Sequence, residues 1–287
     1  MKEKSIIKFE NFSFRYDSAN EFILKNINLE INKNELVILA GPTGCGKSTL
    51  LRSIIGLIPH MHGGEYKGRV IVDQLVVNDV KITDLAKKAG FVFQNPENQI
   101  FMFSIERDIV FGLENLGTSR TIMKERVDSI LSLLKIEHLA TKAPHELSDG
   151  EKQKAALAGI LAMQPKILIL DEPTSLLDPK TAIDFINIVN DLRKKIGMTI
   201  VIVEHRLDLV VGIADKLIIL SNGKIIENNN PKQVLHYSNQ LIPEIGIPVI
   251  SRLYRNLAKS NYDFDNVIVT VKDMVKEMRR KKFNDWI

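Results

Sequence analysis

The sequence has little of what marks a disulfide-bonded, membrane-spanning or cysteine-cluster protein. Its single cysteine, Cys45, excludes an internal disulfide and any metal site built from several cysteines. No apolar run approaches the roughly 18 residues of a membrane-spanning helix. The first residues lead into an alternating pattern rather than an apolar signal segment. We therefore expect a cytoplasmic protein that reaches a membrane, if it serves one, through a partner.

Excess charge is also scarce over most of the chain. The net charge is +4, from 39 basic and 35 acidic residues. Ten basic and six acidic residues lie in 230–287, which leaves 29 of each sign in residues 1–229. This balance argues against a globally basic nucleic-acid binder and marks the tail as a separate unit. The apolar share of 45% and the charged share of 26% are those of an ordinary globular protein.

Short apolar segments that alternate with helical patterns predict an α/β fold. Alternating residues over 5–40, among them Phe12, Phe14 and Tyr16, indicate strands, and apolar residues over 104–163 have helical spacing. After residue 165 strands and helices alternate, which implies a parallel sheet covered on both faces. Further strands are expected at 68–72, 90–93, 166–171, 198–203 and 216–220, and helices at 179–196 and 206–212. Asn222-Gly223 predicts a hairpin turn.

The most specific motif is a glycine loop between an apolar run, Leu36–Ala40, and a helical run, Leu50–Ile55. It has the spacing G-x-x-x-x-G-K-[ST]. Glycines let backbone N–H groups turn inward around an anion, and the following helix adds the positive end of its dipole. Lys47 supplies a charge for the outer phosphates, and the Ser48 hydroxyl can ligate Mg²⁺. A plain glycine turn before a buried helix is the alternative. We expect a triphosphate to be bound by Gly41, Pro42, Thr43, Gly44, Cys45, Gly46, Lys47, Ser48 and Thr49.

An acidic pair, Asp171 and Glu172, follows the apolar strand over 167–170. The carboxyl end of a buried parallel strand is where a nucleoside triphosphatase holds its metal and its attacking water. Asp171 would hold Mg²⁺, directly or through water, and Glu172 would act as the general base. The alternative, an acidic pair that only begins a helix, is disfavoured by the glycine loop.

Further motifs, in order, resemble the ATP-binding cassette of ABC transporters. Residues 147–151, Leu-Ser-Asp-Gly-Glu, resemble the signature loop Leu-Ser-Gly-Gly-Gln, and residues 175–178 resemble the D-loop. Gln94, His205 and Tyr16 resemble the glutamine-loop residue, the switch histidine and the aromatic residue that stacks on adenine. Over residues 12–225 the resemblance implies a P-loop nucleoside triphosphatase fold with an antiparallel β subdomain. It also implies a cassette over 1–229, a helical subdomain at about 95–163 and a small C-terminal appendage over 230–287.

The same resemblance implies roles for the polar residues. Gln94 would offer its amide oxygen to Mg²⁺ or to the attacking water, and His205 would donate a hydrogen bond to the γ-phosphate. Tyr16 would stack on adenine, or alternatively belong to the sheet core. Ser148 and the backbone N–H of Gly150 would reach the γ-phosphate held by a second cassette. ATP would therefore close a cassette dimer, alike or unlike, and hydrolysis would open it.

Two signature positions depart from the family pattern, because Asp149 replaces a glycine and Glu151 a glutamine. A carboxylate about 5 Å from a γ-phosphate would repel it by roughly 3 kcal/mol at an effective dielectric near 20, before screening. The two carboxylates either weaken one composite site of an asymmetric dimer or point to solvent, leaving Ser148 and Gly150 to touch phosphate.

Residues 91–101 resemble the glutamine-loop region of energy-coupling factor ATPases, and so do residues 106–115, 158–163 and 245–249. That branch implies a peripheral ATPase at the cytoplasmic face of the membrane that powers vitamin or transition-metal uptake. Its partners would be a second cassette, a transmembrane coupling subunit and a separate membrane substrate-capture subunit. The apolar run 100–103 would contact the coupling subunit or, alternatively, pack in the core.

Three other functions remain alternatives. They are a soluble ABC ATPase that acts on nucleic acid or the ribosome, the ATPase of a conventional ABC importer, and a subunit that binds ATP without hydrolysing it. We expect no nucleic-acid partner.

Two further expectations concern the thiol and the tail. Cys45 lies near a helix N-terminus and Lys47, so we expect a lowered thiol pKa and a reaction with thiol reagents that ATP prevents. Residues 248–257 and 271–278 have helical apolar spacing. Such short helices must pack on the cassette or on a partner, so we expect a small mixed appendage that contacts its counterpart on the second cassette.

Overall fold

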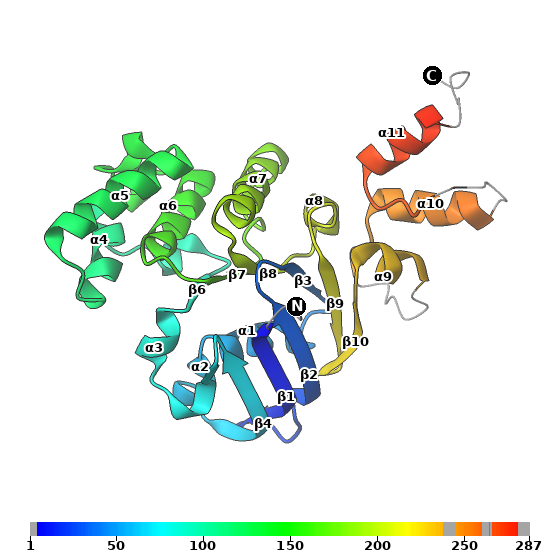
Figure 1. Ribbon diagram of the computed structural model, residues 1–287, viewed down its shortest axis with the longest axis horizontal. Helices are drawn as coiled ribbons and strands as arrows, with labels where there is room; N and C mark the ends of the chain where they lie inside the picture. The colour runs from blue at the N-terminus through cyan, green and yellow to red at the C-terminus, as the bar shows by residue number, and fades with distance from the viewer. Residues whose placement is uncertain (1–4, 238–244, 260–263, 265, 281–287) are drawn as a thin grey trace.

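A six-stranded sheet positions the candidate site in the computed structural model, which describes residues 5–237, 245–259, 264 and 266–280 (Figure 1). The strand order is β10-β9-β3-β8-β7-β6. β3, β6, β7, β8 and β9 run parallel, and β10 pairs antiparallel with β9. The bounds are β3 Leu36–Ala40, β6 Ala89–Val92, β7 Ile167–Asp171, β8 Thr199–Val203, β9 Lys216–Ser221 and β10 Lys224–Asn229.

The parallel strands are apolar along their length because both faces of the sheet are covered. In β3, Ile38 packs into the core on the side of the long helices, whereas Val37 and Leu39 pack into the core on the opposite side. Figure 1 shows α1 and the second sheet on one side of the six strands, and α6, α7 and α8 on the other. The expected α/β fold with a parallel sheet covered on both faces is confirmed.

The second sheet is antiparallel, with the order β2-β1-β4-β5. Its strands are β1 Ser5–Tyr16, β2 Leu24–Asn32, β4 Gly64–Val72 and β5 Leu75–Val76. Phe9, Phe12 and Phe14 of β1 are buried in the core that the second sheet shares with α1 (Lys47–Ile54). The short helices α2 (Leu57–His60) and α3 (Ile82–Ala86) lie beside it. This sheet is the expected antiparallel β subdomain.

The expected helical region is present between β6 and β7. Its helices are α4 Ile105–Asn115, α5 Arg120–Leu134 and α6 Asp149–Ala162, and two short 3₁₀ turns lie between α5 and α6. The Ser104 side chain accepts a hydrogen bond from the Arg107 N–H at the start of α4, and the Ser148 side chain caps α6. α6 packs on α4 and α5 on one side and on α7 on the other.

Caps and turns fix the elements after β7. α7 (Pro179–Ile196) begins at the N-cap Asp178 and ends at Gly197, which has the left-handed conformation that suits glycine. The helix expected at 206–212 is only α8 (Leu207–Val210). Asn222 and Gly223 have φ angles of 48° and 75°, as the tight hairpin between β9 and β10 requires.

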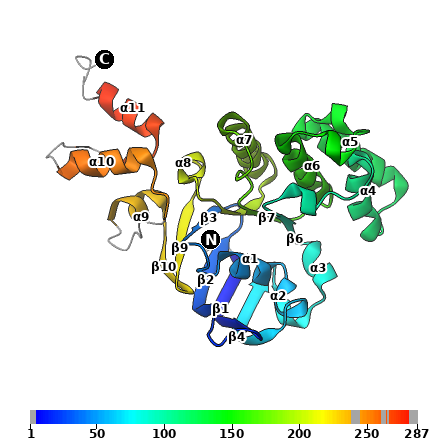
Figure 2. The same cartoon turned by 180° about the vertical axis from the view of Figure 1, so that it is seen from behind.

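The described part of the tail is helical, with α9 Pro231–Tyr237, α10 Val249–Lys259 and α11 Val271–Arg280. Figures 1 and 2 both place these helices on the side of the molecule away from α4–α6. Tyr254, Ile268 and Met274 form a small core of their own. The expected mixed appendage shows no strand among its described residues, and parts of 230–287 lie outside them. Within the described ranges, no helix has the length and apolarity to cross a bilayer.

Tail and cassette are also joined directly. Ile245 and Val269 are buried in the main core beside α8 and α9. Gly246 approaches the His205 carbonyl so closely that a Cβ there would lie 2.6 Å from the oxygen. The Val249 N–H donates to Asp208 Oδ1 at 3.1 Å. The tail therefore packs against the segment that follows β8.

Candidate nucleotide site

The carboxyl ends of four adjacent strands bring the candidate residues together. β3 leads into the glycine loop, β6 into Gln94, β7 ends at Asp171, and His205 follows β8. Because these strands are parallel neighbours, their carboxyl ends share one edge of the sheet. That edge is where open α/β sheets bind ligands.

The glycine loop (residues 41–46) adopts a backbone that other residues would strain. Gly44 and Gly46 have φ angles of 77° and 110°. A Cβ on Gly41 would lie 2.1 Å from the Leu220 carbonyl oxygen. No side chain among the described residues caps Gly46 at the start of α1, so the first N–H groups of that helix remain open to an anion. Pro42 and Ser48 are half-buried, Thr43 and Gly44 are exposed, and Thr49 is buried.

Lys47 is buried, and its ammonium group lies inside the loop. Its Nζ donates to the carbonyl oxygens of Gly41 at 2.8 Å and of Pro42 at 3.0 Å. These two hydrogen bonds hold the positive charge of Lys47 at the loop, and both of their acceptors are neutral carbonyl oxygens. A bound phosphate would offer the ammonium stronger, charged acceptors.

The expectation of a lowered thiol pKa for Cys45 is wrong. The residue is 7% exposed, and burial raises the pKa of its thiol, which the charge of Lys47 offsets only in part. The sulfur lies against the loop backbone, because a Cβ on Gly41 would come within 2.8 Å of Sγ. The sequence argument considered the helix terminus and the lysine but not desolvation.

Glu172 lies between the two other expected catalytic side chains. Gln94 Nε2 donates to Glu172 Oε2 at 3.0 Å, and His205 Nε2 lies 2.9 Å from Glu172 Oε1. The backbone of Glu172 has a φ of 49°, an unusual conformation for this residue type that occurs at functional sites. The structure thus assembles three side chains that lie 78 and 33 residues apart in sequence.

Asp171 lies deeper, beside Ser48. Burial raises the pKa of Asp171 and the neighbouring Glu172 charge adds to this rise, against a hydrogen bond from the Ser48 hydroxyl. A half-buried carboxylate next to a hydroxyl fits Mg²⁺, which takes one or two protein oxygens and completes its shell with phosphate and water. No group of three or more His, Cys, Asp and Glu that would hold a metal by themselves occurs in the part of the chain described.

Glu204 is a structural member of the site that the sequence argument missed. It is 4% exposed, and its Oε1 accepts from the backbone N–H groups of His205 at 2.9 Å and Arg206 at 3.0 Å. Its other oxygen accepts from the Thr174 hydroxyl. The Arg206 side chain donates to the carbonyls of Thr174 and Leu177. The histidine segment is therefore tied to Thr174 and Leu177, the second of which lies in the segment 175–178 that resembles the D-loop. The only sequence feature that could have indicated Glu204 is its place between an apolar strand and His205.

Tyr16 stands at the rim of the site and is half-buried. Its hydroxyl lies 3.3 Å from Thr49 Oγ1, and its ring packs edge-on against Phe14 at a centroid distance of 4.8 Å. The ring is supported by the sheet core without being enclosed in it. Tyr16 therefore has features of both alternatives: part of its ring packs on the sheet core, and part is accessible for stacking on adenine.

Ser148 and Gly150 lie apart from this cluster, at the N-terminus of α6. Within the described chain, no hydrogen bond joins either of them to the glycine loop or to Glu172. Ser148 and Asp149 are exposed. Gly150 contacts α7 so closely that a Cβ would lie 2.5 Å from Thr181 Cγ2. The signature residues are thus presented outward rather than toward the phosphate loop of their own chain.

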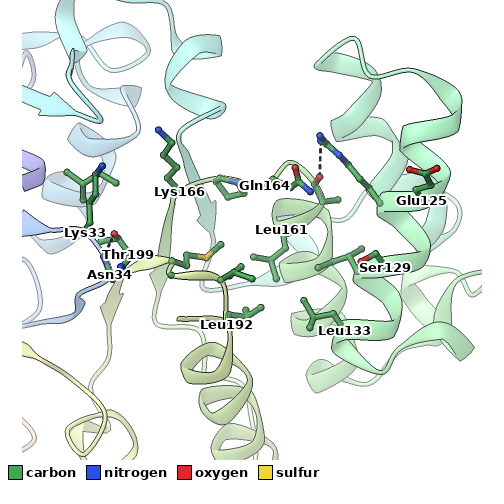
Figure 3. A pocket seen from close by; sticks show the side chains of 18 residues that line it. Lys33, Asn34, Glu125, Ser129, Leu133, Leu161, Gln164, Lys166, Leu192 and Thr199 are labelled. Carbon is green, nitrogen blue, oxygen red and sulfur yellow. Dashed lines mark hydrogen bonds between the residues drawn. The ribbon is translucent and has the colours of Figure 1, made fainter. Parts of the chain in front are cut away.

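A separate cavity of about 720 Å³ lies at the opposite edge of the sheet (Figure 3). Lys166 and Thr199 line it near the amino ends of β7 and β8, and Arg126 of α5 donates across it to the Ala162 carbonyl. None of its 18 lining residues is a candidate nucleotide-site residue. The chemistry of the chain is therefore concentrated at the carboxyl edge.

The fold and the site together define the class of protein. A glycine loop follows β3, an acidic pair stands at the end of β7, and a helical insertion lies between β6 and β7. The glycine loop and the acidic pair are the features of a P-loop nucleoside triphosphatase. The family model described as ABC transporter matches residues 24–175. The chain belongs to the ABC transporter family: it is an ATP-binding subunit that hydrolyses ATP for transport.

Similar proteins support this conclusion over most of the chain. The energy-coupling factor transporter ATP-binding protein EcfA1 of Ligilactobacillus salivarius is 39% identical over 277 residues, covering 96% of each chain. A putative ABC transporter ATP-binding protein of Methanosarcina mazei is 36% identical over 283 residues, but this chain spans only 48% of its length.

Two solved structures are also similar. The structure of cbiO1 from Clostridium perfringens, part of the ABC transporter complex cbiONQ, aligns with a TM-score of 0.75 and 33% identity, covering 90% of this chain and 100% of that one. The ATP-binding cassette MJ0796, a dimer bound to ADP and Pi, aligns with a TM-score of 0.67 and 30% identity, covering 78% and 98%.

Proposed function

We propose that this chain powers uptake of a micronutrient, a vitamin or a transition-metal ion, as the ATPase of an energy-coupling-factor-type transporter. The similarity to EcfA1 supports this over 96% of both chains, tail included. The observation that carries the membrane role is an exposed aromatic patch beside Gln94. Gln94, which follows the first aromatic residue of this patch in the sequence, donates a hydrogen bond to Glu172, so a partner bound here would lie on the same chain segment as a residue of the nucleotide site.

We use the name docking patch for three aromatic residues close to Gln94 in the sequence, Phe93, Phe101 and Phe103, all of which are exposed, the last two by 64% and 86%. The Phe101 ring packs on Phe111 of α4 at 5.0 Å, so the patch is held in place. The apolar run 100–103 is thus divided, because Ile100 is buried in the core. Exposed apolar clusters of this kind mark partner sites, and we assign this one to the transmembrane coupling subunit.

We propose the following roles for the site residues, supported by their placement at one edge of the sheet. Lys47 would exchange its two carbonyl acceptors for phosphate oxygens, while the backbone N–H groups of residues 43–49 surround the phosphates. Glu172 would take a proton from the attacking water, and His205 would donate to the γ-phosphate. Tyr16 would stack on the adenine.

A magnesium ion would be held by Ser48 and Asp171, and Gln94 would supply its amide oxygen. When bound, Mg²⁺ neutralises charge that develops on the phosphates. Its positive charge would also favour the ionised form of Asp171, against the burial that raises the pKa of this carboxyl.

A second cassette, alike or unlike, would complete each site. Ser148 and the N–H of Gly150 would reach the γ-phosphate bound by the partner, as their outward position allows. We propose the division into a cassette over 1–229, with the helical subdomain at about 95–163, and a C-terminal appendage over 230–287. The appendage would contact its counterpart through exposed apolar residues of α10 and α11, namely Val249, Leu253, Val271 and Val275. A separate membrane subunit would capture the substrate.

Purification from detergent-solubilised membranes of the native host tests the transport role. We expect the tagged full chain to bring down, in stoichiometric amount, a membrane protein with several spanning helices. Phe101→Ser with Phe103→Ser should lose it, while Ile122→Ser, an exposed apolar change on α5, should keep it. ATPase activity of the free chain should not change in either variant. Recovery of nucleic acid or ribosomes instead would contradict the proposal and favour a soluble ABC ATPase.

A further inference from the structure

The Ser148 hydroxyl is already engaged within its own chain. Its Oγ donates to Glu151 Oε2 at 2.7 Å, and the Ser148 backbone N–H donates to the same oxygen at 2.9 Å. The Glu151 N–H donates back to Ser148 Oγ at 3.4 Å. This is a capping box at the start of α6, with one addition: the serine proton also goes to the glutamate.

A serine hydroxyl carries a single proton. While that proton is donated to Glu151, the hydroxyl can only accept, and a phosphate oxygen offers it nothing to accept. Ser148 must therefore release Glu151 before it can donate to a phosphate. A carboxylate is a stronger acceptor than a neutral amide, so the identity of residue 151 decides how readily this exchange occurs.

The surroundings keep Glu151 ionised. The two hydrogen bonds from Ser148 hold the pKa of Glu151 below its usual value against partial burial, and the charges of Lys142 and His138 add to this. His138 Nε2 lies 3.9 Å from Glu151 Oε1. At neutral pH the group beside the Ser148 hydroxyl is thus an anion, which would also repel an approaching phosphate.

We propose that Glu151 is a positioning residue that holds the Ser148 hydroxyl away from the nucleotide of the partner cassette and so raises the ATP concentration at which two cassettes close. The inference rests on the composite site of the proposed function. Glu151 touches no nucleotide of its own chain and acts through Ser148. ATP binding by a single cassette is therefore unaffected by residue 151.

Asp149 provides the matched control. It is exposed, adjacent to Ser148 and carries the same charge. Asp149→Asn removes one negative charge from the signature loop and leaves the contact between Ser148 and Glu151 intact. Glu151→Gln removes the same charge and weakens that contact, while glutamine still suits the third position of a capping box. Equal thermal midpoints for the two variants would show that α6 is equally stable in both.

The experiment measures ATP-driven pairing of full chains by sedimentation, with the partner cassette present and Glu172→Gln in every variant to prevent hydrolysis. Glu151→Gln should lower the ATP concentration for half-maximal pairing about fivefold, the ratio expected when a neutral acceptor replaces a charged one. Asp149→Asn should change it by less than about twofold, as for an exposed charge. With Ser148→Ala also present, Glu151→Gln should have no further effect.

An equal effect of Asp149→Asn and Glu151→Gln would overturn the inference, since it would show repulsion by loop charge alone. A Glu151→Gln effect that persists with Ser148→Ala would overturn it too. Pairing that is insensitive to residue 151 would refute the inference and leave the composite site standing. Absence of ATP-driven pairing in all variants, Glu151→Gln included, would refute both. Fluorescent-ATP binding to the unpaired chain should be equal throughout.

Discussion

Glu172 is the residue on which the proposed chemistry depends most. Glu172→Gln keeps the shape of the side chain and its contacts to Gln94 and His205 but removes the base. We expect phosphate release to fall by about 10²–10⁴, the usual contribution of a general base, with MgATP binding retained. Steady-state phosphate release and equilibrium binding measure the two quantities. Glu125→Gln, an exposed change on α5, should behave as the wild type; unchanged turnover of Glu172→Gln would refute the role.

Cys45 should react slowly, because its thiol is buried and its pKa is raised. At pH 8 the folded chain holds less thiolate than a free cysteine would, and access is restricted as well. We expect alkylation by iodoacetamide to be at least about tenfold slower than in the urea-unfolded chain, followed by mass spectrometry. Similar rates in the two states would show that the thiol is open in solution.

The residues whose roles depend on order and spacing could be predicted from the sequence. The glycine loop, the acidic pair, Gln94 and His205 each follow a strand, and parallel strands necessarily bring them to one edge. The contacts of Glu204 could not be predicted, because they depend on side-chain conformations. The spacing of Ser148 and Glu151 is that of a capping box, but the additional bond from the Ser148 hydroxyl to Glu151 could not be predicted, for the same reason. The wrong expectation for Cys45 has a related cause, since burial is a property of the folded chain.

At the scale of elements, one buried carboxylate links the two sheets. Asp73, in the turn between β4 and β5, has a side chain 5% exposed and lies 2.7 Å from Lys166 Nζ and 3.1 Å from Lys88 Nζ. These lysines precede β7 and β6. Burial works to raise the pKa of Asp73, but both ammonium groups outweigh it, so the pKa lies below its usual value.

Asp73→Asn should therefore lower the free energy of unfolding by about 1–3 kcal/mol at pH 7, measured by urea denaturation. Since the folded pKa lies below the unfolded value of about 3.9, the stabilisation is complete above the latter and is lost as the pH falls toward the folded pKa. The difference in the free energy of unfolding between the wild type and Asp73→Asn should thus stay constant above about pH 5 and become smaller below about pH 4. Asp184→Asn, exposed on α7, should cause neither change; a gap independent of pH would contradict the ion pairs.

Elements with strong end signals could be predicted closely. α7 has an aspartate cap, a proline at its first position and a glycine just beyond its end, and it spans the expected residues 179–196. α8 is shorter than expected, and α9 was not predicted. Each makes about two turns or fewer, too short for a helical period to show in the sequence.

At the scale of the whole molecule, the tail offers a surface for a second cassette. Leu253 of α10 and Val275 of α11 are exposed apolar residues, so replacing them should not disturb the small core of the tail. We expect Leu253→Ser with Val275→Ser to weaken cassette pairing without nucleotide and to leave ATP binding intact. Sedimentation of the full chain measures this. Lys272→Ser, an exposed polar change on α11, should pair normally. Equal pairing of the wild type, the double variant and Lys272→Ser would show that α10 and α11 only cover the core and do not contact a second cassette.

The fold class could be predicted because strand, loop and helix recur in sequence order. The docking of the tail onto the cassette could not. It depends on contacts such as that between Gly246 and the His205 carbonyl, which join positions that no local pattern relates. Truncation of the tail is consequently a poor test of pairing, because it would uncover the core at Ile245 and Val269.

The close approach of Gly246 to His205 has a genetic consequence. A methyl group at residue 246 would displace the carbonyl of His205, although residue 246 lies in the tail. A random screen for chains that fold but no longer split ATP should therefore return Gly246→Ala together with changes in the glycine loop. Phosphate release from purified Gly246→Ala should be lower than from Gly159→Ala, a change in α6 whose Cβ would meet the nearest atom outside that helix's backbone only at 3.8 Å. Equal phosphate release from the two variants would show that the tail does not influence ATP hydrolysis through this contact.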